Sequence, residues 1–216
     1  MLEGLPATRL ALSVELTRKL RVHIVPACGG RGGSWAGRGR QMAARPLLRL
    51  SLRHGKGAHP LPVGYAHDRS RSCLGRGAAP FEAARRGFKR WAMFDLGWVR
   101  VANPRAGILP GEIVAVEAHT LGLWTVNYSR IVETIDAATC FGFLYATTGI
   151  HVEAGEERFL LRFDPETEEV WYEIEAISRP HAVLAMLGYP VTRRFQRRFA
   201  RDSHVRMREV VEEACG

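Results

Sequence analysis

The densest run of side chains capable of chemistry is His151, Glu153, Glu156 and Glu157, which fall within seven residues. An imidazole beside carboxylates can provide a general base or ligands for a hard metal ion. Acidic residues in such a run also commonly solvate a hairpin or pair with a basic neighbour, here Arg158. The sequence therefore predicts no metal site and no cofactor, and it leaves Glu157 and His151 as candidates for acid–base catalysis.

Glu157 differs from the others because the strand pattern places its carboxylate on an apolar face. It shares the parity of Phe159, and Tyr145 shares the parity of Phe143 in an earlier alternating run. Burial on such a face would raise the pKa of the Glu157 carboxyl, so the group needs a hydroxyl or guanidinium partner. Tyr145 is one such partner. The other donors available are Asn127, Arg130 and Arg179.

Aromatic residues of one parity form the second part of the candidate site. Aromatic rings with a few convergent polar groups are typical of a cavity for a small apolar ligand. A purely structural ion-pair network predicts the same residues, so both interpretations stay open. The predicted ligand-binding set is Asn127, Arg130, Phe143, Tyr145, Glu157, Phe159, Tyr172 and Arg179.

An enzyme of the cyclase, hydrolase or isomerase kind is the alternative function. In it, Glu157 or His151 would act as acid or base, and Arg130 or Arg179 would hold an oxyanion. All of these groups would have to converge on one open volume. The sequence contains no nucleophile elbow, phosphate-binding loop or Ser/His/Asp arrangement. We therefore rank a binding module for a small apolar or lipid-like ligand above an enzyme.

Hydrophobic periodicity predicts the elements that position these residues. Residues 80–91 follow the helical period, with Phe81, Ala84, Phe88 and Trp91 on one face. Short β-branched or alternating runs predict strands at 98–101, 113–118, 121–135, 140–147, 157–163 and 170–176. Two helices follow, a short one at 178–188 and a long one of about 23 residues from Pro190.

Strands grouped between helices favour an α+β fold over alternating βαβ units. The period of two indicates an antiparallel sheet with one buried face. A curved antiparallel sheet of about six to seven strands that grips the long C-terminal helix would bury both apolar faces. This is the helix-grip architecture of START, Bet v 1 and polyketide-cyclase-like proteins, in which a cavity lies between the sheet and the helix.

Charge divides the chain into two parts. The 216 residues carry 31 Lys and Arg and 22 Asp and Glu, a formal net charge of +9. Residues 1–60, the leader, hold 11 of the basic and two of the acidic residues, which leaves 20 of each in residues 61–216. We predict a single α+β domain at 61–216 and a leader that contributes nothing to the fold and is disordered through about residue 44.

Three interpretations of the leader compete. Its arginines could bind RNA or DNA, its acid-poor composition resembles an organellar transit peptide, and it could be an upstream extension from a misassigned start codon. The last is favoured because the basic residues show no repeat and no aromatic interleaving beyond Trp35. Binding to nucleic acid is thus predicted only through the leader. Residues 46–53 alternate leucine with polar residues and could add an edge strand.

The lack of a recognisable targeting signal and the spacing of the cysteines predict a cytoplasmic protein. No stretch approaches the roughly 20 apolar residues that span a bilayer. The apolar run at 10–14 is too short for a secretory signal. The four cysteines (Cys28, Cys73, Cys140 and Cys215) form no CxxC pair, so reduced thiols are expected.

From Leu61 onward the sequence resembles the uncharacterised protein family 0548, a bacterial and plant family of unknown function. The matching stretches include LPVGY at 61–65, WAMF at 91–94, GFLYAT at 142–147, HVEAGEERF at 151–159 and VWYEI at 170–174. They occur in the family's order and cover about residues 61–212. The resemblance implies little about activity, because the family is uncharacterised. Residues 45–60 depart from it, since they lack the usual Tyr- and Gly-containing first strand, and this would leave a sheet edge unpaired.

Overall fold

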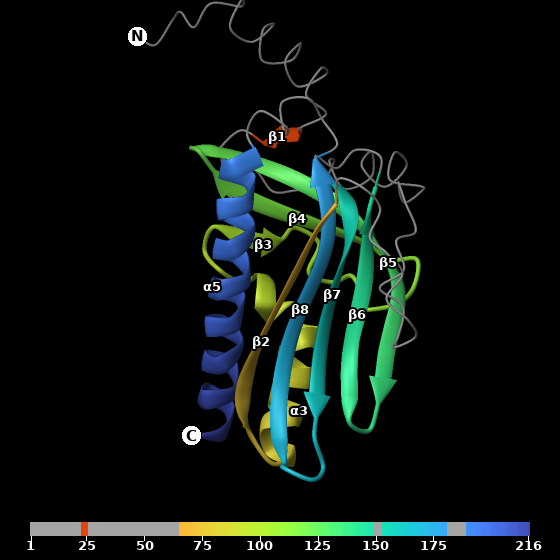
Figure 1. Ribbon diagram of the computed structural model, residues 1–216, viewed down its shortest axis with the longest axis vertical. Coiled ribbons are helices and arrows are strands. Elements are labelled where there is room, and N and C mark those ends of the chain that lie inside the picture. The colour runs from red at the N-terminus through yellow and green to blue at the C-terminus, as the bar shows by residue number, and fades with distance from the viewer. Residues whose placement is uncertain (1–22, 26–64, 149–152, 181–188) are drawn as a thin grey trace, which may run out of the picture.

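The computed structural model describes residues 23–25, 65–148, 153–180 and 189–216, and Figure 1 shows their arrangement. The strands are β1 (His23–Val25), β2 (Ala66–Arg76), β3 (Val99–Val101), β4 (Ile113–Thr120), β5 (Leu123–Ala137), β6 (Cys140–Thr147), β7 (Glu153–Phe163) and β8 (Glu169–Pro180). The helices are α3 (Ala78–Lys89), the 3-10 turn η1 (Ala92–Phe94) and α5 (Tyr189–Cys215).

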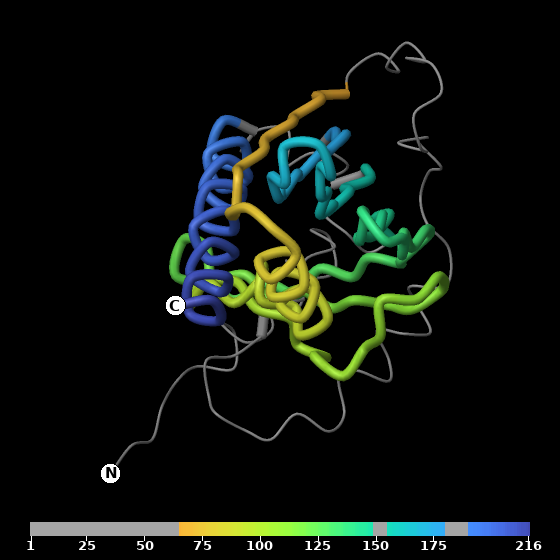
Figure 2. The backbone as a smooth tube through the Cα atoms, turned by 90° about the horizontal axis from the view of Figure 1, so that it is seen from below, coloured from red at the N-terminus to blue at the C-terminus, as the bar shows by residue number. Residues whose placement is uncertain are grey.

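Seven strands form one curled antiparallel sheet in the order β2-β8-β7-β6-β5-β4-β3. The sheet curls until its two edge strands, β2 and β3, approach opposite sides of α5, which closes the opening between them (Figures 1 and 2). The inner face of the sheet is the face toward α3 and α5. This arrangement confirms the predicted α+β helix-grip fold.

The amphipathic pattern around residue 80 forms α3, which lies inside the curl at the end where α5 finishes. Pro80 is in its first turn, where the missing N–H leaves no helical hydrogen bond unmade. Phe81, Ala84 and Phe88 are buried against the sheet. Gly87 lies so close to α5 that a Cβ there would be 2.9 Å from a methyl group of Val210.

Most predicted strands match the observed ones, and β6 matches at both ends. The long run after residue 121 is a single bent strand, β5, with a register shift between Ile131 and Glu133. The predicted helix start at Ser178 is wrong. Ser178 pairs with Gly155 inside β8, so a strand of alternating residues continues to Pro180. The rest of that predicted helix lies outside the described residues.

β2 is a strand that the sequence analysis did not predict. It pairs with β8 from Ala66 to Arg76 and is an edge strand of the sheet. Residues 45–60, whose lack of the usual first strand was expected to leave an edge unpaired, lie outside the described residues. The sequence of β2 escapes hydrophobic pattern recognition because polar residues occupy both faces. Asp68, Ser70 and Ser72 point inward and alternate with outward basic residues.

The leader contributes one described element. His23–Val25 form β1 and pair with Trp124–Val126 of β5, so the prediction that the leader adds nothing to the fold is wrong for these residues. The remaining leader residues, including the predicted edge strand at 46–53, lie outside the described residues. Cys73, Cys140 and Cys215 are free thiols.

Candidate functional site

The space between the inner face and the helices has two ends of different composition. Around α3 and η1 it is filled by an aromatic core built from Phe88, Phe94, Phe143, Phe159 and Tyr172, which are almost completely excluded from solvent. Around the first half of α5 it is lined by polar and half-buried side chains. We call this second region the polar end.

Rings in the aromatic core contact one another directly. Phe143 and Phe159 stack across the β6–β7 pair with centroids 5.1 Å apart, and Phe94 of η1 lies 5.2 Å from Phe159. Phe88 meets Tyr172 edge-on at 5.6 Å. Three of the four aromatic residues predicted to line a cavity are therefore packed against side chains of α3 and η1.

Tyr145 and Glu157 lie where the aromatic core meets the polar end. They are directly opposite in the β6–β7 register, and the Tyr145 hydroxyl donates to Oε2 of Glu157 at 2.6 Å. The Tyr145 ring also packs on Phe159, with centroids 5.6 Å apart. Their shared inward parity is confirmed, and a tyrosine hydroxyl is the partner that a carboxylate on this face requires.

Arg130 and Arg179 lie on the outer face and do not join Glu157. Arg130 pairs with Ala146, which neighbours Tyr145 in the strand, so the two side chains point to opposite faces. Arg179 stacks on Tyr65, with its guanidinium carbon 5.0 Å from the ring centroid. The expectation that these arginines meet Glu157 at one site is wrong, because each is one residue out of phase. His151 lies outside the described residues.

Asn127 lies on the inner face of the polar end, in register with Val116 of β4. Both side chains are half-buried, although the sheet surrounds them and α5 lies opposite. The same is true of Ala176, the partner of Glu157 in β8, and of Phe195 and Phe199 in α5. Side chains between α5 and the sheet are therefore less completely buried at this end than in the aromatic core.

Two clusters that the sequence analysis missed hold α5 against β2 and β8. Arg193 donates through both of its terminal nitrogens to the Asp68 carboxylate, and Gln196 donates to the Ser178 hydroxyl at 3.3 Å. The hydrogen bond from Arg193 holds the pKa of Asp68 below its ordinary value, against the opposing effect of burial. These contacts connect elements far apart in the chain, so no local spacing could predict them.

The second cluster centres on His204 of α5. Its Nδ1 is 2.8 Å from the Ser72 hydroxyl and its Nε2 is 2.9 Å from the Ser70 hydroxyl. Burial, helped by the positive charge of Arg208, lowers the pKa of His204 to about 4, so the ring is neutral at physiological pH. Beside it, Ser203 and the Tyr172 hydroxyl are 2.8 Å apart. The alternation of Ser70 and Ser72 was the available signal.

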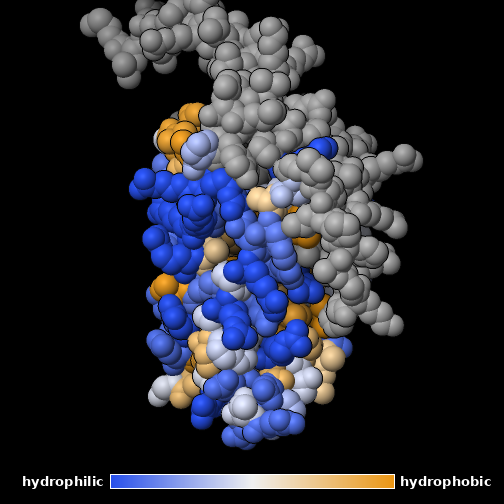
Figure 3. All heavy atoms as spheres, viewed as in Figure 1, coloured by the Kyte–Doolittle hydropathy of each residue, from blue (hydrophilic) through white to orange (hydrophobic). Residues whose placement is uncertain are grey.

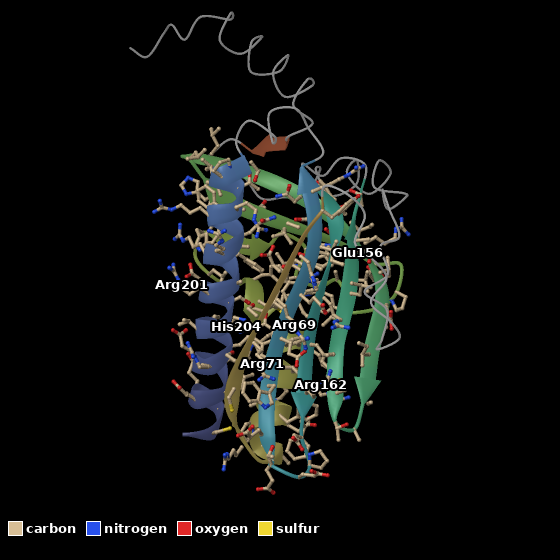
Figure 4. All side chains as sticks on the ribbon, in the orientation of Figure 1. Arg69, Arg71, Glu156, Arg162, Arg201 and His204 are labelled. Atoms are coloured by element: carbon tan, nitrogen blue, oxygen red, sulfur yellow. The ribbon has the colours of Figure 1, made fainter. Side chains whose placement is uncertain are left out.

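The outer face carries a ladder of ion pairs, part of which Figure 4 shows around Arg69, Arg71 and Arg162. Glu173 pairs with Arg69 at 3.4 Å and Arg162 at 3.7 Å, so its side chain points outward. Such pairs explain how carboxylates can be nearly buried on a sheet surface. This ladder is a structural feature rather than a continuation of the Tyr145–Glu157 pair.

Over the ranges that the structure describes, His, Cys, Asp and Glu side chains nowhere gather in threes suited to a metal ion. In the same ranges, every helix is too short or too polar to cross a membrane.

Comparisons with known proteins agree on the family. The model of the family described as "Domain of unknown function (DUF1990)" matches residues 52–206. A UPF0548 protein of Dictyostelium discoideum is 36% identical over 155 residues, which cover 67% of this chain and 72% of that protein. A UPF0548 protein of Arabidopsis thaliana is 28% identical over 146 residues, covering 65% of this chain and 70% of that one.

Solved structures of low sequence identity are also similar to this chain. The structure of Ara h 8.0201 has a TM-score of 0.47 at 14% identity, covering 69% of this chain and 99% of that one. TTHA0849 from Thermus thermophilus has a TM-score of 0.49 at 12% identity, covering 70% and 100%. From the matched family model and the relatives, the chain belongs to the UPF0548 family and contains its DUF1990 domain.

Proposed function

We propose that this protein is a cytoplasmic binding module for a small, mostly apolar ligand with one hydrogen-bonding group. The ligand would lie at the polar end, between the first half of α5 and the inner face of the sheet. The observation that carries the proposal is the Tyr145–Glu157 hydrogen bond, in which the carboxylate lies between the closed aromatic core and the less buried side chains of the polar end.

Apolar surface at the polar end supports an apolar ligand body. Val116 and Ala176 on the sheet face Phe195 and Phe199 on α5, and all four are only half-buried. Covering this surface with a ligand would contribute about 25 cal/mol for each Å² removed from water. The buried rings of Phe143, Phe159 and Tyr172 would form the floor of the site rather than its walls.

Glu157 would accept a hydrogen bond from a ligand hydroxyl or amide. Tyr145 fixes the orientation of the carboxylate, and Asn127 offers an amide on the same face of the sheet. An ionised carboxylate has about four acceptor positions, so a ligand donor can bind Glu157 alongside the Tyr145 hydroxyl. Binding is preferred to catalysis because Arg130 and Arg179, the cations needed for oxyanion stabilisation, lie on the outer face.

The test is a panel of lipid-like and polyketide-like ligands, screened by thermal shift and native mass spectrometry. Ala176→Phe would place a ring where the ligand should lie, directly opposite Glu157. We expect it to weaken binding at least about tenfold, and Glu157→Gln to weaken ligands that carry a hydroxyl about tenfold.

The matched control is Glu133→Gln, the same change on β5, which is separated from β7 by β6, at a position paired with the outward Leu144. It should leave ligand affinity unchanged. Failure of the wild type to bind any ligand in the panel, or equal affinity of the wild type and both site variants, would contradict the proposal.

A further inference from the structure

The hairpin between β4 and β5 presents two leucines to solvent. Leu121 is 78% exposed and Leu123 is 49% exposed. Leu121 and Gly122 both have positive φ angles, 52° and 77°, in a two-residue turn closed by Thr120 and Leu123. Turns of this kind favour Asn or Gly at the first position, since a leucine there is strained. Neither leucine gains packing within the described part of the chain that would offset this cost.

A strongly basic surface follows the first half of α5. Arg194, Arg197, Arg198 and Arg201 point away from the sheet, and the last two share the Asp202 carboxylate. Arg194 and Arg197 form no ion pair with any residue that the structure describes. The charge of Arg194 is therefore available to an anionic partner, and that of Arg197 acts in part on the Asp68 carboxylate of β2.

These two features adjoin each other. Trp98, next to β3, packs on Phe195 of α5, lies under the Arg198 guanidinium at 4.3 Å, and accepts a backbone hydrogen bond from His119 of β4. The hairpin tip lies beside the start of α5 in Figure 1. Figure 3 shows hydrophobic side chains projecting at this corner, directly above the hydrophilic face of α5. Val191, which is 43% exposed, adds to the apolar part.

We propose that this corner, the hairpin patch of Leu121, Leu123, Val191, Arg194 and Arg197, docks on the surface of an anionic lipid bilayer. The leucines enter the apolar edge of the bilayer, and the arginines contact phosphate and carboxylate groups of the lipids. Behind the tip, Trp124 stacks on His119 with centroids 5.0 Å apart, and such aromatic rings favour the membrane–water interface. This membrane contact is independent of the ligand proposed above.

The shape of the hairpin patch favours a bilayer over other anionic partners. Its leucines project from a narrow hairpin tip, and a fluid bilayer accommodates isolated projecting side chains. A protein partner would need a complementary surface of about 1,000 Å² or more. A nucleic acid would use the arginines but would gain little from exposed leucines, because single strands are bound mainly by aromatic stacking and phosphate contacts.

The experiment is co-sedimentation of the full chain with vesicles of phosphatidylcholine alone or mixed with phosphatidylserine. The hairpin variant is Leu121→Asn/Leu123→Thr, in which asparagine tolerates the positive φ and threonine suits a strand. We expect it to be at least as stable as the wild type but to bind anionic vesicles about tenfold more weakly. If the leucines instead stabilised the fold, the hairpin variant would be less stable than the wild type.

The charge variant is Arg194→Gln/Arg197→Gln. Each arginine near an anionic surface contributes about a fivefold change in affinity, so we expect about a 25-fold loss on anionic vesicles. The basic leader adds a salt-dependent background to every variant, so variants are compared with the wild type within the full chain.

Two matched controls complete the design. Leu109→Ser removes a leucine that is 60% exposed in the loop before β4, and Arg86→Gln/Lys89→Gln removes two charges from α3 at the other end of the molecule. Both should bind anionic vesicles with the same affinity as the wild type, since all of these chains carry the same basic leader. The proposal is overturned if the wild type ignores anionic vesicles, or if the hairpin variant binds them as well as Leu109→Ser does. It is also overturned if soluble glycerophosphoserine or RNA is bound instead of vesicles.

Discussion

The aromatic core and the polar end occupy the same layer of the fold, yet they are held together by different forces. In the aromatic core, rings from the sheet, α3 and η1 exclude water and pack with their centroids 5.1 to 5.6 Å apart. At the polar end, hydrogen bonds and one ion pair join α5 to β2 and β8, and apolar side chains remain half-buried. The difference separates a part of the layer in which aromatic packing stabilises the fold from a part that is held mainly by polar contacts.

The division follows from where α3 lies. This helix fills the inside of the curl at one end only, and among the described elements α5 is the helix that covers the inner face at the other end. A single helix cannot bury all of a curved sheet. Under the proposed function, the ligand would lie at this end, where it would not displace the aromatic core.

The largest expected effect comes from truncating an aromatic ring in the core. Phe88→Ala removes a fully buried ring that contacts Phe143 and Tyr172, and we expect it to lower the free energy of unfolding by about 3–5 kcal/mol. Phe195→Ala makes the same change at the polar end and should cost only about 1–2 kcal/mol, because that ring is half-buried. Urea unfolding of both variants measures the difference. Equal losses would show that the two ends are packed alike.

A second expectation concerns pH and the neutral His204. Its folded pKa of about 4 is below the ordinary value of 6.5, so protons bind the unfolded chain more tightly than the folded one. The stability due to neutral His204 is complete above pH 6.5 and is lost as the pH falls towards 4. Over this interval the loss is about 3 kcal/mol.

The measurement is urea unfolding from neutral pH down to pH 4. His204→Gln should be less stable at neutral pH, because Ser70 and Ser72 lose their ring partners, and its stability should fall less steeply with acid. The control is His119→Gln, which removes an exposed histidine and shows how far the loss of an imidazole outside this cluster changes the pH dependence of stability. A slope in His204→Gln as steep as that of the wild type would mean that other groups cause the acid sensitivity.

Local periodicity was sufficient to predict the fold. Alternation along 140–147 and 157–163 placed Phe143, Tyr145, Glu157 and Phe159 on one face, and the structure confirms this parity. The pattern is local because each strand must bury one face. β2 was not predicted, because its inward side chains, Asp68, Ser70 and Ser72, are polar. They can face inward because Arg193 and His204 of α5 form hydrogen bonds with them.

The candidate site was less predictable from the sequence, because it too depends on contacts between segments that are far apart in the chain. Parity alone identified the Tyr145–Glu157 pair, because directly opposed residues share a face. Arg130 was assigned by its chemistry rather than by its parity, and it lies on the outer face. Which end of the inner face is closed depends on the placement of α3, a tertiary feature that no single segment encodes.

Removing one hydroxyl from each end provides a smaller, sharper test. Tyr172→Phe leaves Ser203 without its partner in a fully buried position, and we expect a loss of about 2 kcal/mol. Tyr145→Phe removes the hydrogen bond to Glu157, but water at the polar end can replace it, so about 1 kcal/mol is expected. Thermal or urea unfolding compares the two. A larger loss of stability in Tyr145→Phe than in Tyr172→Phe would mean that the closed core extends past Glu157.

The smallest expected effect is at the ion pair between Asp68 and Arg193. Asp68→Asn keeps an oxygen that can accept from Arg193 but removes the charge, and the Asp68 side chain is 44% exposed. Screening by solvent therefore limits the loss to less than about 1 kcal/mol, and added salt should reduce it further. The pKa of Asp68 lies below its ordinary value of 3.8 in the folded chain, so its contribution is present above that pH and is lost as acid titrates the folded carboxyl. The wild type and Asp68→Asn should accordingly differ in urea unfolding at neutral pH and low salt, and converge in strong acid. A difference that persists in acid and in high salt would mean that Asp68 holds α5 through its shape and hydrogen bonds rather than through its charge.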